Sequence, residues 1–502
     1  MKIAKSIALL LFLFSFSASS SVYGSADVTI TFRGNKAKVK FHASDSLQVQ
    51  TDGAHVHVTS LYRGHRLRVV VSGRSDDGQL LLTSAGKAQV RLEGLDLTCQ
   101  DGAPLWLKNK KRVEIVAARR TDNILCIAAC QDTARQKAAV VWSKDKVRFS
   151  GRGSLRLLAK GDGCKGVRAK GDVEVERLNL QVITTGNNLG EDLSWMERMG
   201  TGFMPGDSLG FPPGGFGPPP FGDFDMPPFG EFGPPPFEDF DMPPFGEFGP
   251  PPGDSLNIPF GGFGGPMKHK YLGTAKALKS LGRIIVTSGT LDVQTNSPGA
   301  EGIEGKQGVE LSGGTVTVLA VDDAINANAP ILFSGADVTA RSTTNDAVDA
   351  NDYSRPFFSW GQGQDDSEPT PMIVVTDGTV RAWSQVGPPE EGLDCDFSPI
   401  AISGGIVFTA GSGMGDMPSV PTSATAQQPT LLLTGLPITE GQPVSLTDDA
   451  ERIVLQMVLP FSLQRSSTLL SHPSLKLGQR YTLRTVGYER TFSLTDSFTV
   501  VR

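Results

Sequence analysis

The chain has 502 residues and a formal net charge of −6, with 47 Lys and Arg against 53 Asp and Glu. This acidic balance argues against a basic nucleic-acid-binding surface, so we expect no nucleic-acid partner. The 58 Gly and 34 Pro exceed ordinary usage and are unevenly spread, which indicates turns in some regions and low complexity in others.

The chain begins with the features of a secretory signal. Lys2 and Lys5 precede an apolar run of signal-peptide length, and small residues follow it. We therefore expect residues 1–25 to be cleaved on export, which makes the mature protein secreted, periplasmic or held at the surface of a bacterium. The remainder contains no apolar run of membrane-spanning length, so we expect no transmembrane anchor.

Residues 26–75 alternate apolar and polar side chains in short runs such as VTITF, AKVKF and HVHVT. A period of two predicts strands of about five residues with polar outward positions. The bare end of a stack of strands would expose unpaired backbone groups. This N-terminal β region is therefore expected to cap such a stack.

Residues 76–427 contain a repeat. GIEGKQGVELSGGTVTV at 302–318 and AINANAPILFSGADVTA at 324–340 both contain a small-apolar-polar-small corner, a short strand, a Gly-containing turn and a second strand. Successive repeats start 22 to 25 residues apart. This period predicts a parallel β-solenoid, in which each coil buries its inward face against its neighbours. We expect Ile303, Ile325 and Val348 to stack as one inward ladder.

Two inserts interrupt the repeat, and a different pattern follows it. Residues 187–273 contain a tandem of FGDFDMPPFGEFGPPP type, which predicts a disordered Phe-, Pro- and Gly-rich loop. A spacer is the favoured interpretation, and the alternative is a segment that contacts sugar, a partner or the cell wall. A shorter loop is expected at 353–371. Residues 428–502 predict a small antiparallel β module that caps the other end.

Aligning the repeats predicts two outward rows at one corner of the coils. Both rows are basic in two coils and acidic or amide in the next four, and like charges in stacked strands repel unless a cation intervenes. Carboxylate and amide oxygens suit Ca²⁺. The candidate metal ligands are Asp322, Asp323, Asp346, Asp349, Glu391 and Asp394. The candidate carbohydrate contacts are Glu301, Asn326, Asn351 and Asp396. A hydrated acidic surface without metal is the alternative.

Several segments, taken in order, resemble a known family. They are GAPLWLKNKKRVEIVAARRTDNIL, AAVVWSKDKVRFSGRGSLRLLAKGDGCKGVRAKGDVEV, DDAINAN, NDAVDAN and FTAGSGMGDMPSVP. The chain resembles secreted bacterial carbohydrate-binding parallel β-helix proteins of the clostridial polygalacturonate-binding type, whose fold is similar to that of family 9 pectate lyases. The resemblance implies a right-handed parallel β-helix, calcium and a uronate-rich polysaccharide partner. The basic early corners and the Phe-Pro insert depart from the family pattern.

We therefore expect an all-β, exported, monomeric and non-catalytic protein that binds acidic, pectin-like polysaccharide with calcium. Two alternatives stay open. One is a polysaccharide lyase of the same fold with Lys165, Arg168 or Lys306 as base, and the other is a surface adhesin or structural protein. Trp106, Trp142 and Trp360 are candidates for stacking on sugar rings, although core packing explains Trp142 equally well. Cys395 is expected to be a buried thiol.

Overall fold

The computed structural model describes residues 27–129, 138–191, 271–351, 370–395, 398–411 and 418–502. Contacts divide the chain into a large unit, residues 1–190 and 271–502, and a small unit, residues 191–270. The expected signal segment, the centre of the insert at 187–273 and most of the loop at 353–371 lie outside the described residues. Within these ranges no helix is long and apolar enough to cross a membrane. The large unit is described below.

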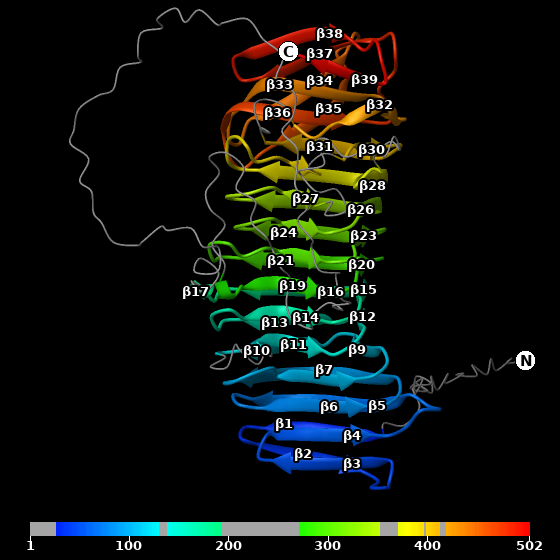
Figure 1. The fold of residues 1–502 in the computed structure, drawn as a ribbon, viewed down its shortest axis with the longest axis vertical. Helices are drawn as coiled ribbons and strands as arrows, with labels where there is room; N and C mark the ends of the chain where they lie inside the picture. Colours follow the sequence, from blue (N-terminus) through cyan, green and yellow to red (C-terminus); the bar gives the residue numbers. More distant parts are fainter. Residues whose placement is uncertain (1–26, 130–137, 192–270, 352–369, 396–397, 412–417) are drawn as a thin grey trace, which may run out of the picture. The chain divides into compact units, whose positions relative to one another are not determined.

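In its described residues the large unit is built of β-strands, and Figure 1 shows them stacked along one axis. One face of the stack is an eleven-stranded sheet made of β3 (Leu47–Asp52), β4 (His55–Ser60), β6 (Gln79–Ser84), β8 (Leu105–Asn109), β11 (Ala139–Ser143), β14 (Lys165–Ala169), β19 (Lys276–Ser280), β22 (Ile303–Gly305), β25 (Ile325–Ala327), β27 (Val348–Ala350) and β29 (Leu393–Asp394).

The other two faces belong to a continuous 22-stranded sheet. Its first half comprises β1 (Val28–Arg33), β2 (Lys36–Phe41), β5 (Leu67–Ser75), β7 (Ala88–Cys99), β9 (Val113–Ala117), β10 (Asp122–Ile127), β12 (Val147–Gly151), β13 (Ser154–Ala159), β15 (Val173–Glu176), β16 (Leu178–Thr184) and β20 (Ile284–Val286). Its second half comprises β21 (Gly289–Thr295), β23 (Val309–Leu311), β24 (Thr315–Ala320), β26 (Ile331–Ser342), β28 (Ile373–Ser384), β30 (Ile400–Ile402), β31 (Ile406–Ala410), β32 (Pro421–Ala426), β33 (Thr430–Ile438), β36 (Leu463–Ser471) and β39 (Phe498–Val501).

Each regular coil contributes one strand to each of three faces. The coil of β14, β15 and β16 pairs in parallel with that of β19, β20 and β21, which pairs with β22, β23 and β24. This is the arrangement of a solenoid-like parallel β fold. The register joins Ile303 to Ile325 and Ile325 to Val348, and all three side chains are fully buried. The inward ladder expected from the repeat is therefore confirmed.

Small residues and glycines form the corners of the coils. A Cβ added at Gly302 would lie 2.4 Å from the Val318 side chain and 2.5 Å from the Ala324 carbonyl oxygen, so the corner tolerates only the smallest side chains. At the next corner Gly314 has a φ of +84°, a conformation that favours glycine. The Ser-Gly signals in the sequence therefore mark where the chain turns between two faces.

Both ends of the stack contain antiparallel pairs, which the sequence predicted only for the C-terminal end. At the N-terminal end β1 pairs with β2 and β3 with β4, both antiparallel, before the parallel coils begin. At the C-terminal end β36 pairs antiparallel with β31 and β33. A four-stranded antiparallel sheet follows, made of β34 (Pro443–Asp448), β35 (Ile453–Val458), β37 (Arg480–Thr485) and β38 (Tyr488–Ser493). A second hydrophobic cluster, with Tyr481 fully buried, lies in this region.

β17 (Leu189–Glu191) and β18 (Tyr271–Gly273) occupy the two ends of the expected insert at 187–273. The described ends of this segment are therefore short strands. Its tandem Phe-Pro sequence lies outside the described residues.

Candidate functional site

A single line of outward-facing residues runs along the eleven-stranded sheet, and we call it the outer ladder. Its members each follow an inward apolar residue, and the strand register pairs them from coil to coil. In order they are Trp106, Trp142, Arg168, Lys279, Glu304, Asn326, Asp349 and Asp394. The register predicted from the repeat for Arg168 through Asp394 is thus confirmed. The chemistry along the ladder changes from aromatic to basic to acidic.

Much of the outer ladder is buried, although the sequence predicted surface rows. Glu304 is 2% exposed, Asp349 6% and Asn326 8%. The same holds for the second predicted row, in which Asp323 is 3% and Asp346 8% exposed. These polar groups therefore need partners, because an unpaired buried charge is costly.

The partners differ between the basic and acidic parts of the ladder, and Glu304 lies at the boundary. Its carboxylate is 2.6 Å from Nζ of Lys306, 2.9 Å from Nζ of Lys276 and 3.3 Å from Nζ of Lys279. Burial opposes ionisation of Glu304, but these three ammonium groups outweigh it and hold its pKa well below the usual range. Glu304 is therefore an anion that compensates a group of buried lysines.

Glu301 belongs to the same ionic group. Its Oε1 accepts a hydrogen bond from Lys276 Nζ at 2.7 Å. Burial disfavours the charge of Lys276, but Glu301 and Glu304 overcome that effect and raise its pKa. The structure thus places Glu301, predicted to contact carbohydrate, in an ion pair within the protein.

Asn326 connects the carboxylates of adjacent coils. Its Nδ2 donates hydrogen bonds of 2.9 Å to Oδ2 of Asp323 and 2.9 Å to Oδ2 of Asp349. Asn351 Nδ2 donates to the same Asp349 oxygen at 2.6 Å. Asn345 Nδ2 donates to Oδ1 of Asp322 at 2.7 Å. Amide groups therefore separate and hold the carboxylates that the sequence grouped as metal ligands.

Asp346 is a carboxylate of this group whose ionised form is strongly disfavoured. Burial, followed by the charges of Asp394 and Asp323, raises its pKa well above the usual range. Its Oδ1 accepts one backbone hydrogen bond, from Glu391 N, which lowers the pKa but does not compensate. The described residues therefore contain a site where negative charge is insufficiently balanced.

Ser419 completes the acidic end. Its backbone N donates to Glu391 Oε2 at 2.7 Å, and its Oγ donates to Asp394 Oδ1 at 3.0 Å. Sequence reasoning missed this residue, because Ser419 lies beyond the last coil and outside the repeat. Asp396 and Trp360, two further sequence candidates, lie outside the described residues.

The fit of this region to a hard cation is mixed. The donors are carboxylate and amide oxygens, which suit Ca²⁺, and the raised pKa of Asp346 indicates excess negative charge. On the other hand, no three His, Cys, Asp or Glu side chains in the described part of the chain are already gathered in a metal-binding arrangement.

Lys165 lies at the basic end of the second row, where it pairs in register with Lys276. Burial, followed by the charges of Lys279 and Arg168, lowers the pKa of Lys165 to about 7. Its Nζ is 3.4 Å from the Gly163 carbonyl oxygen. This amine therefore exchanges its proton near neutral pH.

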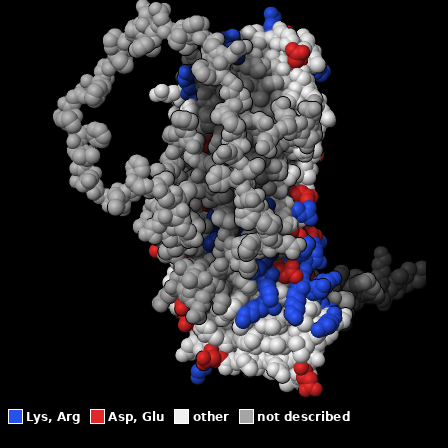
Figure 2. Space-filling view, viewed as in Figure 1, with Lys and Arg blue, Asp and Glu red and all other residues white. Residues whose placement is uncertain are grey.

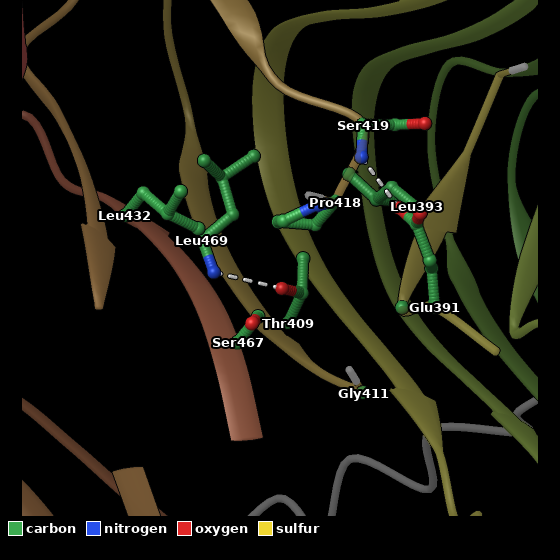
Figure 3. A pocket seen from close by; sticks show the side chains of 10 residues that line it. Glu391, Leu393, Thr409, Gly411, Pro418, Ser419, Leu432, Ser467 and Leu469 are labelled. Atoms are coloured by element: carbon green, nitrogen blue, oxygen red, sulfur yellow. Dashed lines mark hydrogen bonds between the residues drawn. The ribbon is translucent and has the colours of Figure 1, made fainter. Parts of the chain in front are cut away.

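One small cavity lies beside the acidic end, lined by Glu391, Thr409, Ser419 and Leu469 among others (Figure 3). Thr409 Oγ1 accepts a hydrogen bond from Leu469 N at 2.9 Å across it. The interior has room for about one water molecule. It is too small for a sugar ring, so a saccharide ligand would lie on the surface of the coils.

The fold and the ladder define a class: a parallel-strand solenoid that presents charged and aromatic side chains in line along one sheet. The chain belongs to the family described as carbohydrate-binding domain-containing protein, which matches residues 52–192 and 274–411, more than half of its length. Carbohydrate, and polysaccharide in particular, is therefore the partner that the family implies.

One similar protein is a carbohydrate-binding domain-containing protein of Acetivibrio thermocellus, 30% identical over 118 residues. That match covers 22% of this chain and 40% of the relative, so the chain spans about two fifths of the relative's length. A solved structure, a polysaccharide lyase-like protein from C. thermocellum, is 17% identical with a TM-score of 0.39, and the match covers 64% of this chain and 92% of that one. This likeness is too weak to establish a common fold.

Proposed function

We propose that this protein binds acidic, uronate-rich polysaccharide without cleaving it, and that calcium assists at the acidic end of the outer ladder. The proposal includes export, a monomeric state, and a right-handed parallel β-helix of the polygalacturonate-binding type. Asp323, Asp346 and Asp394 would hold the cation, with Asn326 and Asp349 beside them. A divalent cation bound there would supply the positive charge that lets sugar carboxylates approach protein carboxylates.

The observation that carries the proposal is the stacking of buried carboxylates on adjacent coils: Asp323 is 3% exposed, Asp349 pairs in register with Asp394, and Asp346, 8% exposed, has a raised pKa. Burial and the charges of Asp394 and Asp323 disfavour its anionic form, and Asn326 supplies hydrogen bonds but no positive charge. A cation would relieve this repulsion in the folded protein. Calcium should therefore bind the folded state in preference to the unfolded state and stabilise it.

The test is calorimetry of the mature chain with calcium, with magnesium and with chelator, combined with polygalacturonate binding. Calcium should add about 2.7 kcal/mol of stability at a hundredfold excess over its dissociation constant. Asp346→Asn with Asp349→Asn should abolish both that stabilisation and the calcium-dependent part of polygalacturonate binding. Magnesium should do less, because it requires near-ideal octahedral geometry.

The control is a double variant with the same change of charge, Glu310→Gln with Asp377→Asn. The Glu310 carboxylate makes a long ion pair, 3.7 Å, with the half-exposed Arg283, and Asp377 is exposed. The control should keep the full response to calcium. An equal response to magnesium, or an unchanged response in the Asp346 and Asp349 variant, would remove calcium from the proposal.

A second candidate, a polysaccharide lyase, is favoured by Lys165 alone. A neutral amine with a pKa of about 7 suits removal of the proton from C5 of a uronate, with cleavage of the C4–O bond and formation of a C4–C5 double bond. The leaving oxygen would take a proton from water. However, three coils separate Lys165 from Asp323, roughly 14 Å along the axis, so base and proposed cation do not converge on one sugar.

The lyase candidate is tested by following the ultraviolet absorbance of unsaturated products from polygalacturonate. We expect none with calcium present. Product formation that disappears in Lys165→Met, while polygalacturonate binding persists, would establish the lyase instead.

A further inference from the structure

We propose that the coils carrying β8, β11 and β14 form a second carbohydrate site, which binds the uronate chain without a metal ion. We call it the aromatic-basic face, and it consists of Trp106, Lys108, Trp142, Lys144, Arg168 and Lys170. The inference rests on the proposed function for its class of ligand, an acidic polysaccharide. Its geometry is independent of the acidic end of the ladder.

Two tryptophans form the aromatic part of this face. Trp106 and Trp142 pair in register on adjacent coils, with ring centroids 6.2 Å apart and planes at 89°. Leu105 and Leu107 on either side of Trp106 point into the core at 2% and 0% exposure, so the ring points outward. Both rings are half-buried, which fixes them in place while leaving surface for a ligand. The C–H faces of sugar rings pack on such surfaces.

Three lysines line the same face. Lys108 lies on β8, and Lys144 and Lys170 directly follow β11 and β14; each is two positions after a ladder residue, and all three are exposed. Lys108 Nζ is 4.3 Å from the centre of the Trp106 ring, within the range of a cation–π contact. Figure 2 shows another gathering of Lys and Arg where Figure 1 labels β7 and β9, which are strands of the 22-stranded sheet.

These lysines differ from other cations of the same coils in lacking a carboxylate. Lys146 pairs with Asp172 at 2.6 Å and Arg112 with Glu174 at 3.3 Å. Across the described ranges of the chain, Lys108, Lys144 and Lys170 take part in no ion pair. Their charge is therefore available to a ligand, and charge-assisted hydrogen bonds to carboxylates are the strong contacts that such cations make.

The positions of the tryptophans and lysines favour a sugar that carries a negative charge. A sugar ring stacked on Trp106 or Trp142 would have lysines beside it, which suits a ring that carries a carboxylate. A neutral sugar could stack but would leave the lysines without partners. From Trp106 to Arg168 the ladder spans two coil steps, about 10 Å. The face therefore fits a short stretch of a chain rather than a single sugar.

The test is isothermal titration of the mature chain with an oligogalacturonate in chelator at low salt. Binding should persist there and weaken with salt, because the lysines are exposed to screening. Trp142→Ala should reduce affinity about tenfold, as loss of an aromatic anchor does. Trp142→Phe should restore most of it. Lys108→Gln with Lys144→Gln should reduce affinity and flatten the salt dependence.

Two controls accompany these variants. Lys36→Gln with Lys38→Gln makes the same charge change on exposed residues of β2 and should leave binding unchanged. A neutral cello-oligosaccharide of equal length should bind more weakly than the oligogalacturonate. Melting temperatures near wild type would show that Trp142→Ala is folded. If Trp142→Ala does not fold, the variant Lys108→Gln with Lys144→Gln, at exposed residues, still tests the same site.

The proposal is overturned if wild type does not bind oligogalacturonate in chelator, if the Trp142 and lysine variants bind it as well as wild type, or if the neutral oligosaccharide binds equally well. Failure of the proposed calcium site has a different signature. In that case Asp346→Asn with Asp349→Asn keeps calcium-dependent binding, whatever happens in chelator.

Discussion

The coils of β8 to β14 and the coils of β25 to β29 share one sheet, one register and one inward ladder, but their outward residues have opposite chemistry. The first group presents Trp106, Trp142 and Arg168, whereas the second presents Asn326, Asp349 and Asp394. The difference shows that in this fold the inward apolar residues are what the formation and stacking of a coil require. The outward residue is then free to vary in chemistry from coil to coil.

The two regions also satisfy their polar groups differently. Where the ladder changes sign, Lys276 and Lys279 pair with the carboxylates of Glu304 and Glu301. The carboxylates of the later coils are held by amides and by Ser419. The boundary is therefore compensated by ion pairs, while neutral hydrogen-bond donors hold the carboxylates of the acidic end named here.

Glu304→Gln tests the boundary and should have the largest effect. It leaves buried ammonium groups without their common anion, and removal of one partner of a buried ion pair costs about 3–5 kcal/mol. Urea denaturation measures the loss. Glu310→Gln, which breaks a half-exposed contact to Arg283, should cost less than about 1 kcal/mol. Equal effects of the two variants would contradict the role of Glu304.

Lys165→Met tests the basic region. Because the folded pKa of Lys165, about 7, lies below the usual lysine value of 10.5, the unfolded chain holds more protons between those values. Stability should therefore rise with pH across that window in wild type. The variant should lose that dependence and gain about 1–4 kcal/mol at neutral pH, as buried charges replaced by apolar side chains do. If the variant is less stable than wild type, Lys165 makes a contact that the fold requires, and this prediction is wrong.

Asp346→Asn tests the acidic region, with a smaller effect in calcium-free buffer. The raised folded pKa means that the folded protein holds the proton more tightly, so stability falls as pH rises above 3.8. Asn keeps an acceptor for Glu391 N, and the variant should be more stable than wild type at neutral pH. Glu304, whose pKa is lowered, has the opposite dependence: its contribution is lost on acidification. Thermal melts from acidic to neutral pH distinguish the two.

Lys108→Gln with Lys144→Gln should have the smallest effect on stability, within about 0.5 kcal/mol, because both side chains are exposed and make no ion pair in the described residues. Chemical denaturation without ligand measures it. A large loss would mean that these lysines stabilise the fold, which would weaken their assignment to the aromatic-basic face.

The repeat predicted the fold and its register well, because a solenoid coil is a local pattern. Ile303, Ile325 and Val348 recur at nearly constant spacing, and parallel stacking then fixes which residues adjoin. The same alignment placed Arg168, Lys279 and Glu304 in one row. The sequence also indicated a β cap at the N-terminal end, from its alternation, and an antiparallel module at the C-terminal end, from loss of the period, but not the antiparallel pairing of β1 with β2 and β3 with β4.

The sequence predicted the environment of these residues less well. Strand alternation indicates that Glu304 and Asp349 face away from the core, but not that lysines and amides from adjacent coils enclose them. That requires the lengths and rotamers of several side chains together. Ser419 was missed because no repeat extends to it. The aromatic-basic face was visible only as separate tryptophans until the register brought Lys108 and Lys144 beside them.

The regular spacing of the coils has an evolutionary consequence. Each coil contacts only the coils before and after it, so a whole coil can be gained or lost by an in-frame duplication or deletion without redesign of the rest. Loss of residues 302–323 would bring Lys279 against Asn326 and remove the ion pairs of Glu304, while Glu301 would then precede Ala324 and stay opposite Lys276. The length of the eleven-stranded sheet can therefore change in steps of one coil.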